Sequence, residues 1–175
     1  MEDIKAAIRD VPDFPKPGIV FKDITPILAD PELFSKTVQR MAEPWKDANV
    51  DSIIAVESRG FIFGAAMVPL LNAGLVPIRK AGKLPCETVS ETYSLEYGED
   101  TLEMHKDGLA QGGNVLIVDD LLATGGSAKA TANLVEKAGA NIVGFSFLIE
   151  LAFLEGRKKL EGYRIESLIK VSGEE

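Results

Sequence analysis

A strand that leads into two aspartates, a glycine pair and a helix constrains this chain more than any other stretch. Residues 115–130 have the sequence VLIVDDLLATGGSAKA. The first four residues are apolar without alternation and three of them are β-branched, which is typical of a strand buried on both faces of a parallel sheet. Such strands direct their carboxyl ends toward the ligand crevice of open α/β folds. The stretch therefore predicts an α/β domain with a ligand site at the end of this strand.

The residues after the strand suit a ligand that carries a phosphate group and vicinal hydroxyls. Asp119 and Asp120 can accept hydrogen bonds from hydroxyls or hold a hydrated divalent cation. The loop that follows contains two hydroxyl side chains and two glycines, namely Thr124, Gly125, Gly126 and Ser127. Because glycine has no Cβ atom, a ligand can approach the backbone there, and the N-terminus of the next helix offers free N–H groups to an anion.

Two other phosphate-binding motifs do not match this loop. A P-loop has a Lys directly after its last Gly, whereas Ser127 and Ala128 follow Gly126. The dinucleotide-binding fingerprint has three glycines in the order G-x-G-x-x-G, and this loop has only an adjacent pair. A helix N-terminus that follows an acidic turn and binds nothing is the alternative interpretation.

Length and charge exclude several classes of protein. With 175 residues, of which 46% are hydrophobic, the chain is expected to form one domain over residues 1–175. The formal net charge of -8 argues against a nucleic-acid partner, because such surfaces need clustered Lys and Arg. No apolar run is long enough to span a membrane and the acidic N-terminus is unlike a signal peptide, so we expect a cytoplasmic protein without a membrane partner. Cys86 and His105 are too few for a structural zinc site, which leaves magnesium on oxygen ligands as the expected metal.

The segment VLIVDDLLATGGS resembles the phosphoribosyl-diphosphate (PRPP) binding motif of the type I phosphoribosyltransferases. The wider chain, from near Phe14 to about Arg157, resembles the adenine phosphoribosyltransferases of that family. The resemblance implies an open, mostly parallel sheet with helices on both faces, an N-terminal hood (residues 1–30) and a flexible β-hairpin lid (residues 81–106). Ser127 stands where the family usually has Thr, which retains the hydroxyl. The residues implied to bind ribose and the 5′-phosphate are Asp119, Asp120, Ala123, Thr124, Gly125, Gly126 and Ser127.

Two further segments match the places where this family binds the diphosphate. As bare residues, ESRGF (57–61) is a polar turn between a strand and a helix, and RKAGKLP (79–85) is a solvated basic turn. The resemblance implies that backbone N–H groups of the first segment and cations of the second approach the diphosphate, with a cis peptide between Glu57 and Ser58. It also implies that Lys80 acts across a homodimer interface. The implied diphosphate-binding residues are Glu57, Ser58, Arg79, Lys80 and Lys83.

The apolar triplet Ile19–Phe21 follows a proline-rich loop and is, as bare residues, a short strand or a core contact. In the family the matching segment covers the base. The resemblance therefore implies that Phe21 stacks on the purine and that the backbone of Val20 recognises its edge. The implied adenine-binding residues are Val20, Phe21, Lys22 and Arg59.

Residues 93–97 and 101–105 alternate as a hairpin that is expected to turn at residues 98–100. Its SLEYG sequence matches the family's catalytic loop, which closes over the reaction and excludes water. The implied catalytic residues are Glu96, Tyr97 and Arg59, with Glu103 as an alternative carboxylate. A charged, solvated hairpin face is the other interpretation of these acids.

Periodicity and capping residues predict the remaining elements. Asp30 caps a helix, and residues 61–72 form a helix that is expected to be buried all round and capped by Gly74. Gly139 caps the helix after the phosphate loop. The expected strands are residues 52–56, 76–78, 142–149 and 165–171, the last preceded by a short basic helix.

The resemblance implies Mg²⁺-dependent transfer of the 5-phosphoribosyl group from PRPP to N9 of adenine, giving AMP and diphosphate in purine salvage. The resemblance implies no certain direct protein ligand for Mg²⁺. Asp119 and Asp120 are the candidates for binding Mg²⁺ through water molecules. One alternative is transfer to hypoxanthine, xanthine or orotate, although residues 148–153 lack the Lys that 6-oxopurine enzymes carry in a comparable region. A second alternative is a regulator that senses PRPP without catalysis.

Overall fold

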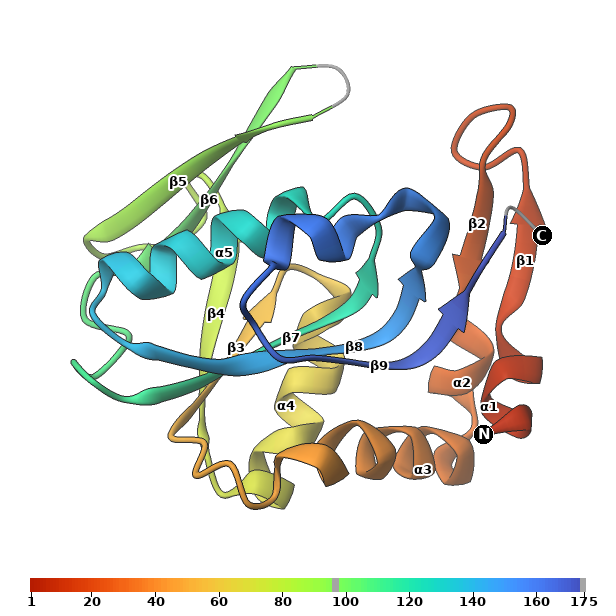
Figure 1. Cartoon of the computed structure of the whole chain (residues 1–175), viewed down its shortest axis with the longest axis horizontal. Helices are drawn as coiled ribbons and strands as arrows, with labels where there is room; N and C mark the ends of the chain where they lie inside the picture. Colours follow the sequence, from red (N-terminus) through yellow and green to blue (C-terminus); the bar gives the residue numbers. More distant parts are fainter. Residues whose placement is uncertain (96–97, 174–175) are drawn as a thin grey trace.

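The computed structural model describes residues 1–95 and 98–173. Within this part of the chain, seven strands form the central sheet in the order β5-β6-β4-β3-β7-β8-β9 (Figure 1). The last five in that order are parallel to one another, while β6 is antiparallel to both β4 and β5. These five are β4 (Gly74–Lys80), β3 (Ser52–Val56), β7 (Asn114–Leu122), β8 (Asn141–Leu151) and β9 (Ile165–Val171). The open, mostly parallel sheet expected from the sequence is confirmed.

Helices cover both faces of the sheet (Figure 1). Helix α5 (Gly126–Lys137) lies on one face together with the 3₁₀ helix η3 (Gly156–Leu160). The helices on the other face are α1 (Glu2–Ala7), α2 (Thr25–Ala29), α3 (Pro31–Ala42) and α4 (Arg59–Leu71), with the 3₁₀ helix η1 (Glu43–Trp45) at the end of α3. A further 3₁₀ helix, η2 (Ala152–Leu154), follows β8. None of the helices in the described ranges is both long and apolar enough to cross a membrane.

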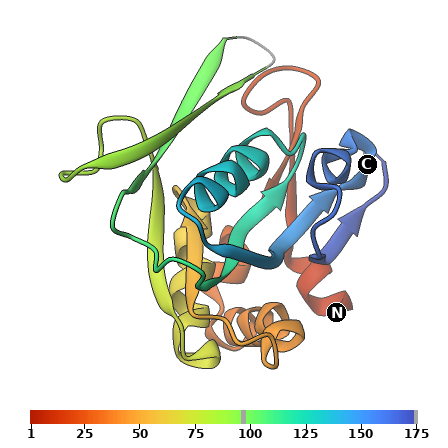
Figure 2. The ribbon, with the colours of Figure 1, turned by 60° about the vertical axis from the view of Figure 1, so that its left-hand side comes forward.

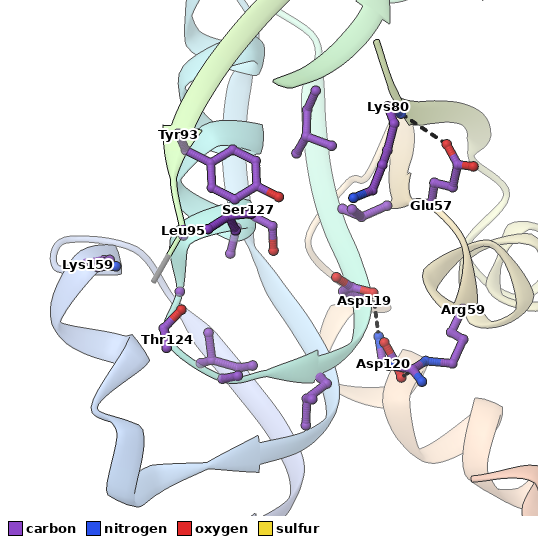
Figure 3. A pocket seen from close by; sticks show the side chains of 18 of the residues that line it. Glu57, Arg59, Lys80, Tyr93, Leu95, Asp119, Asp120, Thr124, Ser127 and Lys159 are labelled. Atoms are coloured by element: carbon purple, nitrogen blue, oxygen red, sulfur yellow. Dashed lines mark hydrogen bonds and ion pairs between the residues drawn. The ribbon is translucent and has the colours of Figure 1, made fainter. Parts of the chain in front are cut away.

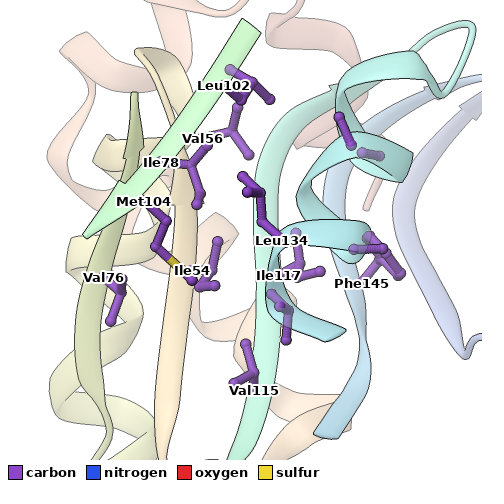
Figure 4. Packing of buried hydrophobic residues seen from close by; sticks show 14 of the residues in the cluster. Ile54, Val56, Val76, Ile78, Leu102, Met104, Val115, Ile117, Leu134 and Phe145 are labelled. Carbon is purple, nitrogen blue, oxygen red and sulfur yellow. The ribbon is translucent and has the colours of Figure 1, made fainter. Parts of the chain in front are cut away.

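The two faces bury separate hydrophobic clusters. On β3, Ile54 packs in the cluster beneath α5, whereas its neighbour Ile53 packs in the cluster that faces α3 and α4. Figure 4 shows Ile54, Ile117 and Leu134 converging in the first cluster. The central strands are therefore buried on both faces, as their unbroken apolar sequence predicts.

Helix α4 differs from its prediction at its end and on its surface. Asn72, with φ of 50°, takes the left-handed position at its C-terminus, and Gly74 instead begins β4. Asn tolerates this conformation because its short polar side chain can hydrogen-bond locally. The helix is also not buried all round, since Ile62 and Leu70 are 39% and 42% exposed. An apolar helix packs only one side on its sheet, so its other side faces outward here.

The lid and the hood rise at opposite sides of the molecule in Figure 1. The lid hairpin consists of β5 (Thr88–Ser94) and β6 (Glu99–His105) and projects from the body of the domain (Figure 2). Glu99 and Asp100 belong to β6, so of the predicted turn residues 98–100 only Gly98 lies outside the strand. The predicted hood, residues 1–30, contains a two-stranded ribbon of β1 (Arg9–Pro12) and β2 (Val20–Asp23) together with α1 and α2.

Candidate functional site

A cavity of about 990 Å³ lies at the carboxyl ends of β3 and β7. Its walls come from the turn after β3, the end of β7, the loop before α5, the lid and η3 (Figure 3). The predicted residues on these walls are Glu57, Ser58, Arg59, Lys80, Asp119, Asp120 and loop 123–127. The parallel strands thus bring together segments that lie far apart in the sequence.

Asp119 and Asp120 lie within β7 and are followed by the last two residues of that strand. The strand continues to Leu122, whereas it was expected to end at Val118. The Asp120 amide donates to Asp119 Oδ1 at 2.8 Å, and Arg59 Nε lies 2.6 Å from Asp120 Oδ2. Burial raises the pKa of the Asp119 carboxyl well above its usual range, and the neighbouring Asp120 charge acts in the same direction. The ionised form of Asp119 is therefore disfavoured in the free protein, and a ligand hydroxyl or cation beside it would favour that form.

The glycine of ESRG allows α4 to begin against the end of β7. A Cβ atom on Gly60 would lie 2.9 Å from Asp119 Oδ1 and 3.0 Å from the Val118 carbonyl oxygen. This close approach requires glycine at position 60. The same approach places the neighbouring residue Arg59 beside Asp120. The ESRGF segment predicts a binding role for Arg59 but none for Gly60.

The phosphate loop is held between η3 and the lid. Gly125 has φ of +79°, and a Cβ atom there would lie 2.5 Å from the Gly156 carbonyl oxygen. A Cβ atom on Gly126 would lie 3.2 Å from the Tyr93 ring. No described side chain caps α5, so the N–H groups of its first turn remain available to an anion.

The cations of the predicted diphosphate site gather around Glu57. Lys83 Nζ lies 2.6 Å and Arg79 Nε 3.4 Å from its carboxylate, which also accepts from the Lys80 amide at 3.0 Å. Burial raises the Glu57 pKa, but the Lys83, Lys80 and Arg79 hydrogen bonds outweigh burial and lower it to about 2. The peptide between Glu57 and Ser58 is cis, as the resemblance implied. Glu57 therefore orients the side chains of Lys83 and Arg79, whereas the Lys80 ammonium pairs with Asp100. Of these three cations, Lys80 is the one on the cavity wall.

The lid contributes residues that the sequence analysis did not select. Tyr93 lines the cavity, and its hydroxyl lies 3.4 Å from Asp100, which is paired with Lys80. Burial and the Asp100 charge raise the pKa of Tyr93 to about 12. Glu103 accepts from the Gly82 amide at 3.0 Å and is not on the cavity wall. No local sequence signal selects Tyr93, which reaches the cavity because β5 packs beside Gly126 of the phosphate loop.

Glu96 and Tyr97 lie outside the described residues.

The hood reaches the site through one contact. The Arg59 guanidinium lies 5.1 Å from the centre of the Phe21 ring, and that ring packs edge-on against Phe14 at 5.3 Å. Lys22 pairs with Asp10 at 2.8 Å, and none of Val20, Phe21 and Lys22 is on the cavity wall. Of the four predicted adenine-binding residues, the structure brings Phe21 and Arg59 together.

Comparison with known proteins is consistent with this geometry. The model of the phosphoribosyl transferase domain matches residues 28–171. The chain belongs to the phosphoribosyl transferase family. It is 56% identical to an adenine phosphoribosyltransferase from Myxococcus xanthus over 167 residues, which cover 95% of this chain and 91% of that protein.

Solved structures of this family also match nearly the whole chain. The crystal structure of adenine phosphoribosyltransferase from Thermoanaerobacter pseudethanolicus is 54% identical, covers 97% of this chain and 99% of its own, and has a TM-score of 0.95. The Saccharomyces cerevisiae enzyme, solved with adenine and an imino-altritol bisphosphate, is 43% identical with a TM-score of 0.90, over 95% of this chain and 97% of its own. The fold implied by the resemblance is thereby confirmed.

The carboxylates of the site suit a metal ion that is shared with a ligand. No group of three or more His, Cys, Asp or Glu residues within the described ranges could hold a metal by itself. Mg²⁺ usually keeps several waters and binds to one or two carboxylates together with substrate phosphates. Asp119 and Asp120 fit this second arrangement.

Proposed function

We propose that this protein transfers the 5-phosphoribosyl group of PRPP to N9 of adenine and forms AMP and diphosphate in purine salvage. The observation that carries the proposal is the cavity, whose walls combine an acidic strand end, an uncapped phosphate loop and the cations Arg59 and Lys80. The relatives named adenine phosphoribosyltransferase, at 52–56% identity, support adenine as the base.

In this proposal the 5′-phosphate and the diphosphate of PRPP bind to different parts of the cavity. The carboxylates of Asp119 and Asp120 accept hydrogen bonds from the ribose hydroxyls, because ionised carboxylates are acceptors with four lone-pair sites. Loop 123–127 holds the 5′-phosphate through its backbone N–H groups and the Thr124 and Ser127 hydroxyls. Ser58, Lys80 and the cations oriented by Glu57 hold the diphosphate.

Catalysis then depends on stabilising the leaving diphosphate. Glycosyl transfer proceeds through an oxocarbenium-like transition state, by analogy with glycosidases. Arg79, Lys80 and Lys83 provide positive charge where the leaving group develops negative charge. Mg²⁺ bound with PRPP, held through water by Asp119 and Asp120, would supply further positive charge to the diphosphate.

The lid and hood supply the remaining proposed roles. Glu96 acts as an acid, base or electrostatic group at the base, with Tyr97 beside it, and lid closure excludes water from the activated sugar. Phe21 stacks on adenine, supported by Arg59 5.1 Å from its ring. The backbone of Val20 recognises the edge of the base. Lys22, which follows Val20 and Phe21 in the sequence, is the remaining proposed adenine-binding residue.

Diphosphate release with PRPP and each of adenine, hypoxanthine, guanine and orotate tests the proposal. We expect turnover with adenine. Turnover with hypoxanthine and none with adenine would overturn the choice of base. Absence of turnover with all four bases would favour a PRPP-sensing regulator instead.

We also propose a homodimer formed through the outer side of α4 and the start of β4. Ile62, Leu70 and Leu75 are large apolar side chains that are 39–42% exposed on these two elements. Lys80 ends the same strand, β4, which supports a role for it across the dimer interface. The cytoplasmic location is a proposal that fractionation of cells producing the protein would test.

A further inference from the structure

We propose that Lys159 is an additional phosphate-binding residue, whose ammonium group pairs with the 5′-phosphate of PRPP and AMP. The inference rests on the proposed function and assigns a binding role to a residue of η3, a segment without a motif of its own. Lys159 lies on the cavity wall. In Figure 3 it is on the same side as Thr124 and Leu95, away from Glu57, Arg59 and Lys80.

The backbone of η3 packs directly on the phosphate loop. A Cβ atom on Gly156 would lie 2.2 Å from the Ala123 carbonyl oxygen, and one on Gly125 would lie 2.5 Å from the Gly156 carbonyl oxygen. Neither position admits a side chain without a backbone shift. The start of η3 therefore has a fixed place beside the loop that holds the 5′-phosphate.

Two anchors fix η3 on either side of Lys159. Arg157 donates to the Glu150 carboxylate through Nε at 2.6 Å and Nη2 at 2.9 Å, and Nη2 also lies 3.4 Å from the Ile165 carbonyl oxygen. The Glu150 side chain is only 5% exposed, so this bidentate pair is largely shielded from water. Leu160 is fully buried in the cluster beneath α5. The backbone that carries Lys159 is thus held in place before any ligand binds.

Lys159 differs from the other cations of the cavity wall in its pairing. Arg59 is paired with Asp120, and Lys80 is paired with Asp100. Within the described part of the chain, Lys159 has neither an ion pair nor a hydrogen bond from its ammonium group, while its neighbour Lys158 pairs with Glu155 at 2.7 Å. A cation beside an anion-binding loop, with no carboxylate partner to displace, is suited to a phosphate ligand.

The test compares Lys159→Gln with Lys158→Gln, which removes a neighbouring exposed charge from the same short helix. We expect Lys159→Gln to raise the KM for PRPP and the Kd for AMP about tenfold or more, as is typical for loss of a hydrogen bond between charged groups. The KM for adenine should change less than twofold, and thermal stability should not change. Lys159→Arg should restore most of the affinity, and Lys158→Gln should behave as the wild type.

Unchanged affinity of Lys159→Gln for PRPP and AMP would overturn the inference and leave the proposed function intact. An equal loss for adenine, or a lower melting temperature, would assign Lys159 a structural role and also overturn it. Failure of the wild type to use PRPP with adenine would instead refute the proposed function, and the inference with it.

Discussion

Two carboxylates of the cavity have opposite electrostatic surroundings. Glu57 is encircled by Lys83, Arg79 and the Lys80 amide, so it stays ionised over the whole physiological range of pH. Asp119 is buried beside Asp120, so its ionised form is disfavoured in the free protein. The first carboxylate organises cations, whereas the second becomes favourable when a ligand brings hydroxyls or positive charge.

This difference predicts the behaviour of Asp119→Asn. A carboxyl whose folded pKa is raised lowers the stability of the fold as pH rises above its unfolded pKa, because ionisation then costs more in the folded state. Asn removes this cost and keeps an acceptor for the Asp120 amide. We expect an equal or higher melting temperature at pH 8, together with at least a tenfold increase in the KM for PRPP.

Scanning calorimetry and steady-state kinetics would check both effects. Asp107→Asn, on an exposed turn away from the cavity, serves as the matched control. A melting temperature several degrees below that of the wild type would contradict the electrostatic argument, and unchanged PRPP kinetics would contradict the role of Asp119 in ribose binding.

Sequence motifs identified the cavity residues that are close together in the sequence better than the cavity residues that tertiary packing brings together. Asp119 and Asp120 follow a strand, so local chemistry was enough to select them. Tyr93 and Lys159 line the same cavity, but each reaches it through packing of a distant element on the phosphate loop. Such contacts depend on tertiary structure, and no local pattern encodes them.

At the scale of elements, the phosphate loop depends on what packs behind it. Gly156 is a backbone neighbour of Ala123, and the space between them excludes a methyl group. Gly156→Ala should therefore displace η3 from the loop, lower the free energy of unfolding by about 1–3 kcal/mol as overpacking does, and raise the KM for PRPP.

Urea denaturation and kinetics of Gly156→Ala would test this dependence. Gly74→Ala is a suitable control, because an added Cβ atom there meets only the Asp51 carbonyl oxygen at 3.9 Å. If Gly156→Ala had wild-type stability and kinetics, the loop would not need η3 behind it.

Element boundaries were harder to predict than element types. Strands β3 and β9 were placed correctly because their apolar runs begin and end sharply. In the lid hairpin, Glu99 and Asp100 are residue types that are depleted in strands, yet they pair in β6 with Ser94 and Tyr93 instead of forming the predicted turn. Cross-strand pairing outweighed local preference there, as it commonly does in sheets.

At the scale of the whole molecule, several paired carboxylates predict acid sensitivity. Hydrogen bonds from cations, amides or hydroxyls outweigh burial and lower the pKa of six of them: Asp3, Asp23, Glu57, Glu91, Asp100 and Glu150. A lowered folded pKa stabilises the fold above the unfolded pKa, and this stabilisation is lost as pH falls through the folded value. For Asp23 and Glu57, with pKa values of about 2, the loss falls between about pH 4.5 and 2.

Urea midpoints at pH 7, 4.5 and 3 would test this prediction. We expect no decrease between pH 7 and 4.5 and a marked decrease at pH 3. A midpoint that stayed constant down to pH 3 would mean that these pairs do not stabilise the fold.

The apolar outer side of α4 gives the last prediction, which concerns assembly. Burying apolar area is the main driving force of association, so a charge at the centre of an interface is costly. Leu70→Glu should convert the proposed dimer to monomers in sedimentation experiments, and should lower kcat if Lys80 acts across the interface. Leu154→Glu is the matched control, since Leu154 is 40% exposed on η2 and Leu70 is 42% exposed on α4. A Leu70→Glu variant that sediments as the wild type would place any dimer contact elsewhere, and a monomeric variant with full activity would confine the site to one chain.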